Sequence, residues 1–114
     1  MTVIYHNPRC SKSRETLALL EEAGITFDVR LYLEKPPSKD ELTQILTQLA
    51  ITPVQLMRTK ETLYKELNLH DTKISDNERI QAMIDHPKLI ERPIVIHNNK
   101  ARIGRPPAQV MELF

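Results

Sequence analysis

The chain has 114 residues, which is enough for one domain with a hydrophobic core and too few for two of ordinary size. Its 16 lysines and arginines nearly balance its 15 aspartates and glutamates, so no overall charge draws it to nucleic acid or to an anionic membrane surface. No apolar stretch is long enough to cross a bilayer, and the N-terminus runs into an expected strand without a signal-like segment. We therefore expect a cytoplasmic protein with no nucleic-acid or membrane partner, in which any affinity for anions is local.

The first third of the chain has a β-α-β pattern. Thr2–Tyr5 is an apolar run that predicts a strand, and Ser13–Ala23 carries apolar residues at helical spacing, with Gly24 as its C-cap. Phe27–Leu31 alternates apolar and polar residues and predicts a second strand, which ends before the Pro36–Pro37 pair. Because a helix connects the two strands, we expect them to be parallel neighbours.

The middle of the chain is predicted to be helical. Ser38 and Ser75 each begin a capping-box signature that is followed by apolar residues at helical spacing. The helix after Ser38 is expected to run to about Leu49. Thr52, followed by a proline, predicts the start of a short helix, and Glu61–Leu67 predicts another turn or two.

The end of the chain returns to strands. Ile94–Ile96 and Ala101–Ile103 flank a polar Asn98–Asn99 turn and predict a hairpin. The Pro106–Pro107 pair predicts the start of a last short helix that ends at Phe114.

Together these elements predict an α/β fold with a thioredoxin-like mixed four-stranded sheet and a helical insertion between strands 2 and 3. Residues 1–33 and 90–114 would form the thioredoxin-like core and residues 38–88 the insert, within a single domain over 1–114.

Cys10 is the only cysteine, and it lies between the first expected strand and the first expected helix. A buried structural thiol is the ordinary interpretation of a lone cysteine. Here, however, the residue lies in a polar, proline-containing loop beside Arg9, Lys12 and Arg14. Unpaired N–H groups at a helix start and nearby cations lower the pKa of a thiol. We therefore interpret Cys10 as a nucleophile.

The residues around Cys10 exclude two kinds of thiol chemistry. A dithiol redox motif would have its second cysteine at position 13, which is Ser13, so no intramolecular disulfide can form. A phosphatase-type loop would have an arginine at position 16, which is Thr16. If Cys10 takes part in a redox reaction, the second thiol must come from outside, and small-molecule thiols such as glutathione are the natural donors.

Three arginines are candidate ligands for an oxyanion. Arg58, Arg92 and Arg105 could each lie on the solvated surface, but the last two precede prolines, which favours extended backbone near strand ends. In a thioredoxin-type fold, Pro93 would be a cis-proline beside the thiol, and Arg92 would then be adjacent to Cys10. Guanidinium groups around a thiolate suit an oxyanion substrate.

The histidines divide into one candidate and three others. His6 could tune the thiolate or only cap its loop. Ser13 could donate a hydrogen bond to the sulfur or cap the helix, and these roles are compatible. The others lack metal-ligand spacing, so we assign no metal site; they are His70, His86 and His97.

Five segments, taken in order, resemble the glutaredoxin-coupled arsenate reductase (ArsC) family, and in particular its short subgroup. They are His6–Leu17, Leu31–Ser38, Leu56–Arg58, Glu91–Val95 and Gly104–Pro106. The resemblance runs from end to end of the chain.

The resemblance implies an enzyme, an arsenate reductase that uses glutathione and glutaredoxin. Cys10 would attack arsenate, and Arg58, Arg92 and Arg105 would hold its oxygens. Glutathione, as co-substrate, would then form a mixed disulfide that glutaredoxin clears, with no bound cofactor. His6 and Ser13 would assist the thiolate.

Two other functions fit the same architecture. One is a regulatory protein similar to the Spx family, which binds RNA polymerase, although members of that family usually carry the paired-cysteine switch that Ser13 removes here. The other is a glutathione-linked thiol transferase acting on protein mixed disulfides.

Overall fold

A computed structural model describes residues 1–114. In chain order its elements are β1 (Thr2–Tyr5), α1 (Ser11–Glu22), β2 (Asp28–Arg30), α2 (Lys39–Leu49), α3 (Pro53–Leu56), α4 (Thr62–Glu66), α5 (Asp76–Asp85), the 3₁₀ helix η1 (Pro87–Leu89), β3 (Ile94–His97), β4 (Lys100–Ile103) and the 3₁₀ helix η2 (Pro107–Leu113). None of the helices is both long and apolar enough to span a membrane.

The chain divides into two compact units, which are described separately. The first, called the core unit, comprises Met1–Lys35 and Arg92–Phe114. The second, called the helical unit, comprises Pro36–Glu91. The sequence predicted a core of 1–33 and 90–114 and an insert of 38–88.

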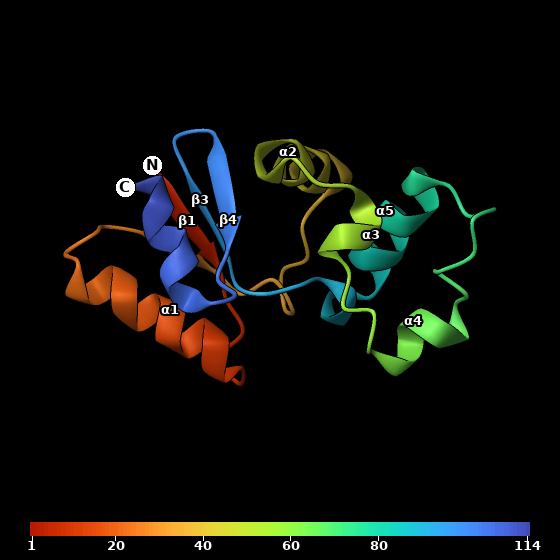
Figure 1. The fold of residues 1–114 in the computed structure, drawn as a ribbon, viewed down its shortest axis with the longest axis horizontal. Coiled ribbons are helices and arrows are strands. Elements are labelled where there is room, and N and C mark those ends of the chain that lie inside the picture. Colours follow the sequence, from red (N-terminus) through yellow and green to blue (C-terminus); the bar gives the residue numbers. More distant parts are fainter. The chain divides into compact units, whose positions relative to one another are not determined.

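The core unit contains a four-stranded sheet in the order β2-β1-β3-β4 (Figure 1). β1 pairs with β2 in parallel and with β3 antiparallel, and β3 pairs antiparallel with β4. A helical connection between β1 and β2 is what their parallel pairing requires. The predicted mixed, thioredoxin-like sheet is confirmed.

Two helices of the core unit, α1 and η2, lie on the same face of this sheet (Figure 1). Ile4 and Val95 are partners in the register of β1 and β3, so their side chains share that face. They pack with Leu20 of α1 and Val110 of η2, and all four side chains are completely buried. This cluster fixes the axis of α1, and with it the helix start that carries the cysteine.

Both ends of α1 follow from local signals. The helix begins at Ser11, two residues before the predicted start, so that Cys10 becomes its N-cap. At the other end Gly24 adopts φ 70°, and its N–H donates to Glu21 O while that of Ile25 donates to Leu20 O. This pair of bonds is the Schellman motif that a glycine after a helix permits.

The second strand is shorter than predicted. The N–H groups of Glu34 and Lys35 both donate to Leu31 O, so the chain turns at Leu31 and leaves Asp28–Arg30 as the strand. β2 also lies at the edge of the sheet, and its Val29 is 47% exposed.

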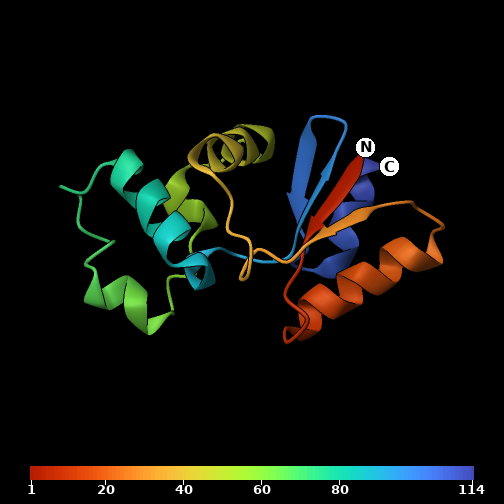
Figure 2. The same ribbon diagram turned by 180° about the vertical axis from the view of Figure 1, so that it is seen from behind.

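The predicted hairpin is confirmed, and its turn follows from the two asparagines. Asn98 and Asn99 have φ angles of 48° and 68°, as a two-residue type I′ turn requires. The two ends of the core unit's chain lie close together beside this hairpin (Figure 2). There His97 pairs with Thr2, whose Oγ1 lies 2.7 Å from its Nδ1, and packs on Phe114 with ring centroids 4.5 Å apart. The last predicted helix is present as the 3₁₀ helix η2.

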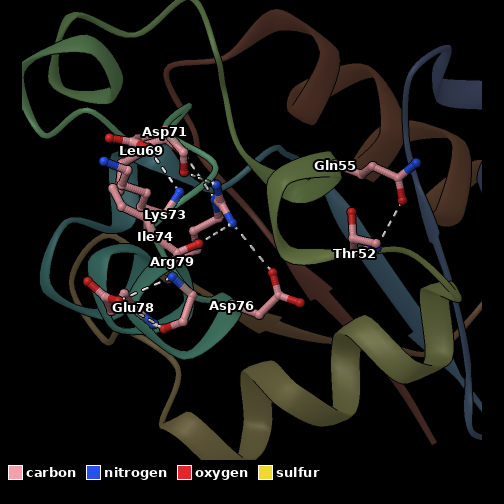
Figure 3. A network of polar contacts seen from close by, with 10 residues as sticks. Thr52, Gln55, Leu69, Asp71, Lys73, Ile74, Asp76, Glu78 and Arg79 are labelled. Carbon is pink, nitrogen blue, oxygen red and sulfur yellow. Dashed lines mark hydrogen bonds and ion pairs between the residues drawn. The ribbon is translucent and has the colours of Figure 1, made fainter.

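The helical unit is held by caps and by one largely buried guanidinium, that of Arg79 (Figure 3). The predicted capping boxes are present at Ser38 and Ser75. Arg79 of α5 donates hydrogen bonds of 2.9–3.0 Å to three carbonyl oxygens of the preceding loop, and its side chain is only 12% exposed. The acceptors are Leu69 O, Asp71 O and Ile74 O. This guanidinium replaces the missing regular backbone bonds of a nine-residue connection between helices.

Candidate active site

Three segments of the core unit leave the sheet at the same end. Tyr5 pairs with Ile94, and Ile94 pairs with Ile103. The loop after β1, the residues before β3 and the residues after β4 therefore begin side by side. They bring Cys10, Arg92 and Arg105 together, although these residues are far apart in the sequence.

Cys10 is a free thiol at the N-cap of α1 and is 8% exposed. Its loop is folded by Asn7, whose carbonyl oxygen accepts from the Cys10 N–H at 3.0 Å and whose Oδ1 accepts from the Arg9 N–H at 3.0 Å. The second bond is an Asx turn, which asparagine forms readily. The thiol thus has a fixed backbone and only a small opening to solvent.

The pKa of Cys10 lies below its usual value, although burial of the sulfur is the largest influence and acts to raise it. Burial is outweighed by the backbone N–H of Ser13, the charge and hydrogen bond of the Arg92 guanidinium, and the backbone N–H of Lys12. The Cys10 side chain makes no N-cap hydrogen bond of the kind that a serine oxygen makes. The thiolate is favoured by the helix start and by an arginine, as the sequence indicated.

Arg105 also faces the sulfur. Its Nη2 lies 3.8 Å from Cys10 Sγ, and its Nε donates to Arg92 O at 2.9 Å. The predicted cis peptide bond between Arg92 and Pro93 is confirmed, and the bond between Arg105 and Pro106 is also cis, which was not predicted. Arg92 is half-buried and Arg105 is exposed, so Arg105 is the more accessible of the two guanidinium groups.

The sequence suggested that the Ser13 side chain donates a hydrogen bond to the sulfur, but in the structure it bonds to other groups. Its Oγ lies 2.6 Å from His6 Nδ1 and accepts from the Asn7 N–H at 3.0 Å, and the residue is completely buried. What Ser13 offers the sulfur is its backbone N–H. His6 contacts this serine, and its own pKa is lowered, first by burial and then by the charge of Arg14. Of its two expected roles, holding the loop is the one that the contact with Ser13 supports.

Arg58 belongs to the helical unit. Its Nη1 lies 3.2 Å from Glu61 Oε2, and its backbone N–H donates to Leu89 O at 2.7 Å. Its role as a third ligand for an oxyanion stays a prediction.

Two features of the site were missed from the sequence. Asn7, which folds the loop through both its carbonyl and its side chain, could have been found from the Asn-Pro dipeptide, a common turn former. The hydrogen bond between Arg105 and Arg92 had no local signal, because it joins residues on two different strand ends. No group of three or more His, Cys, Asp or Glu side chains is placed to hold a metal ion.

A buried, ionisable cysteine facing two arginines at the end of a mixed sheet defines an activated-thiol site on a thioredoxin-like fold. The model of the ArsC family matches residues 5–113, and the chain belongs to this family.

Similar proteins match along nearly the whole chain. The uncharacterized protein YfgD of Escherichia coli K12 is 60% identical over 96% of this chain and 93% of its own. An arsenate reductase of Haemophilus influenzae is 55% identical over 98% of this chain and 97% of its own. The solved structure of an arsenate reductase from Vibrio cholerae superposes with a TM-score of 0.96 at 59% identity, covering 99% of this chain and 97% of that one.

Proposed function

We propose that the protein is a thiol-dependent arsenate reductase in which Cys10 is the nucleophile and glutathione and glutaredoxin are the external thiol donors. The observation that carries the proposal is the pair of guanidinium groups at a sulfur whose pKa is lowered. Similarity to proteins named arsenate reductase over nearly the whole chain supports the choice of oxyanion.

In the first step the Cys10 thiolate attacks the arsenic(V) centre. An S–As bond forms, an As–O bond breaks, and that oxygen leaves as water after protonation. Negative charge gathers on the remaining arsenate oxygens, and donors already in place stabilise it without reorganisation. Arg105 is suited to this because its 3.8 Å contact with the sulfur is longer than an ordinary charge-assisted hydrogen bond and its side chain is exposed.

In the second step the thiolate of glutathione attacks the Cys10 sulfur. The S–As bond breaks, its electron pair stays with arsenic, and one proton passes to an arsenite oxygen, so arsenic(V) becomes arsenic(III). Cys10 and glutathione are left oxidised as a mixed disulfide. A glutaredoxin thiol then takes over the glutathione by thiol–disulfide exchange and returns Cys10 to the thiol. Because the chain has one cysteine, it cannot supply the second thiol itself.

Arg58 would complete the set of oxyanion ligands in this proposal. A glutathione-linked thiol transferase would use the same sulfur but has no oxyanion to hold. Arg58→Ala separates the two functions. For oxyanion reduction we expect the variant to have a lower kcat or a higher KM for arsenate, whereas the rate of disulfide exchange should change little.

The test is a coupled assay. Purified protein is mixed with arsenate, glutathione, glutaredoxin, glutathione reductase and NADPH, and NADPH consumption is followed. We expect consumption that depends on arsenate and on each thiol donor and that disappears in Cys10→Ser. A wild-type rate equal to that of Cys10→Ser would reject arsenate reduction. Copurification with RNA polymerase subunits would then favour a regulatory role.

A further inference from the structure

Gly104 lies at a point where three parts of the core unit meet. A methyl group placed on its Cα would be 2.5 Å from Thr16 Oγ1 and 2.7 Å from Pro93 Cγ, both too short for real carbon contacts. The backbone of Gly104 is outside the left-handed region, so the absence of a side chain here is a matter of space rather than of dihedral angle.

Neither neighbour can yield easily. Thr16 is completely buried in α1, and its hydroxyl donates to Lys12 O at 2.8 Å. The packing around it and this hydrogen bond both restrict its χ1 rotamer. Pro93 is a buried ring with little internal freedom. An added methyl group must therefore displace the Gly104 backbone, the Pro93 segment, or both.

The displaced segments are those that carry the two guanidinium groups. Gly104 N–H donates to Pro93 O at 2.9 Å, and one residue further Arg105 Nε donates to Arg92 O at 2.9 Å. These two bonds join the segment before β3 to the segment after β4. Thr16 completes the arrangement, because it belongs to the same helix whose first turn holds the sulfur.

We propose that Gly104 is a positioning residue that sets the distance of Arg92 and Arg105 from the Cys10 sulfur. Because Gly104 has only a hydrogen atom in place of a side chain, the arginine segments can lie directly against α1 at Thr16, six residues after the cysteine. The inference concerns the ionisation of Cys10 and does not depend on which substrate the site takes.

Gly104→Ala tests this, with the rate of Cys10 alkylation by iodoacetamide measured against pH. We expect the pKa of Cys10 to rise, because the guanidinium groups move away from the thiolate. At a pH below the wild-type midpoint, the alkylation rate should fall by about tenfold or more, the scale of one lost hydrogen bond to a charged group. Only the thiolate reacts, so the rate reports its population.

Gly24→Ala is the matched control, because it makes the same change at the other end of α1. There the strain comes from φ 70° and nothing lies within 4 Å of the added methyl group. We expect it to lower the melting temperature while leaving the alkylation profile unchanged. A Gly104→Ala protein that folds and keeps the wild-type profile would overturn the proposal.

A second variant covers the case in which Gly104→Ala does not fold. Thr16→Ala combined with Gly104→Ala removes the shorter of the two clashes and leaves the one with Pro93. If the single variant can be measured, an alkylation profile of the double variant that lies between those of the wild type and Gly104→Ala supports the proposal. If the single variant does not fold, a double-variant profile displaced to higher pH than that of the wild type supports it. A folded double variant with the wild-type profile, in the absence of a measurable single variant, contradicts it.

Discussion

Replacing Ser13 by alanine separates two roles that one residue plays. The side chain bonds to His6 Nδ1 and to the Asn7 N–H, whereas the backbone N–H acts on the Cys10 sulfur. Alanine removes the first pair of contacts and keeps the second. We therefore expect Ser13→Ala to lower stability and to leave the thiol as reactive as before.

The stability loss follows from burial. Ser13 is completely buried and His6 nearly so, and a buried polar group without a partner costs about 1–3 kcal/mol. Asn7 is half-buried, so water can partly replace its lost acceptor. The two losses together lower the unfolding free energy by about 2–3 kcal/mol, or roughly 10 °C in melting temperature for a domain of this size.

Two measurements check this expectation. Urea unfolding gives the change in stability, and the rate of iodoacetamide alkylation against pH gives the ionisation of Cys10. Ser11→Ala is the control, because that side chain is exposed in the same helical turn and its loss should change stability by no more than about 0.5 kcal/mol. An alkylation profile displaced to higher pH, with unchanged urea midpoint, would show that the hydroxyl serves the sulfur and that our assignment of its partners is wrong.

Three further outcomes are expected. Arg92→Gln should raise the pKa of Cys10, because it removes both a charge and a hydrogen bond from the thiolate, and Arg105→Gln should raise it less; alkylation against pH measures both. The pKa of His6 is lowered in the folded protein, so as pH falls the imidazole of the unfolded chain is protonated before that of the folded chain. The unfolding free energy should therefore decrease as pH falls below about 6.5. His6→Asn should lessen that decrease, as measured by urea unfolding at several pH values. Arg79→Lys should cost about 2 kcal/mol by urea unfolding, since one ammonium group cannot reach three carbonyls as the guanidinium does.

Each of these has an outcome that contradicts it. Arg9→Gln removes an exposed charge from the same loop, and an equal effect from it would mean that general charge, not contact, lowers the pKa of Cys10. A His6→Asn protein with the full pH dependence of the wild type would place the responsible proton elsewhere. Wild-type stability in Arg79→Lys would show that the loop before α5 does not need its guanidinium.

The helix ends and the hairpin could be predicted because their signals are local. A capping box needs only two residues three positions apart, and Ser38 and Ser75 each formed one. The turn at Asn98 and Asn99 needs two residues that tolerate positive φ. The end of β2 was less predictable. It is set by a turn in which Leu31 O accepts from the N–H groups of Glu34 and Lys35, and no residue pattern before the prolines indicates this turn.

In the candidate site, only the contacts that follow from the order of the strands could be predicted from the sequence. The sheet topology puts the segment before β3 beside the loop after β1, which is why Arg92 could be expected near Cys10 from the pattern of elements. The partners of Ser13 and the close approach of Gly104 to Thr16 depend on side-chain directions and on the spacing between a helix and two strand ends. Sequence periodicity carries neither kind of information.

The burial of Cys10 explains why the site needs more than one stabilising group. Burial is the largest single influence on the sulfur and opposes ionisation, so a helix start alone would leave less thiolate. Arg92, half-buried, supplies both a charge and a hydrogen bond to the sulfur. Arg105 is exposed and its Nη2 lies 3.8 Å from the sulfur, so in the proposed reaction it would turn to an incoming oxyanion at little cost to the thiolate. In the proposed reaction, this arrangement would keep Cys10 ionised while Arg105 moves to the substrate, since one arginine alone would have to leave the sulfur at the moment of attack.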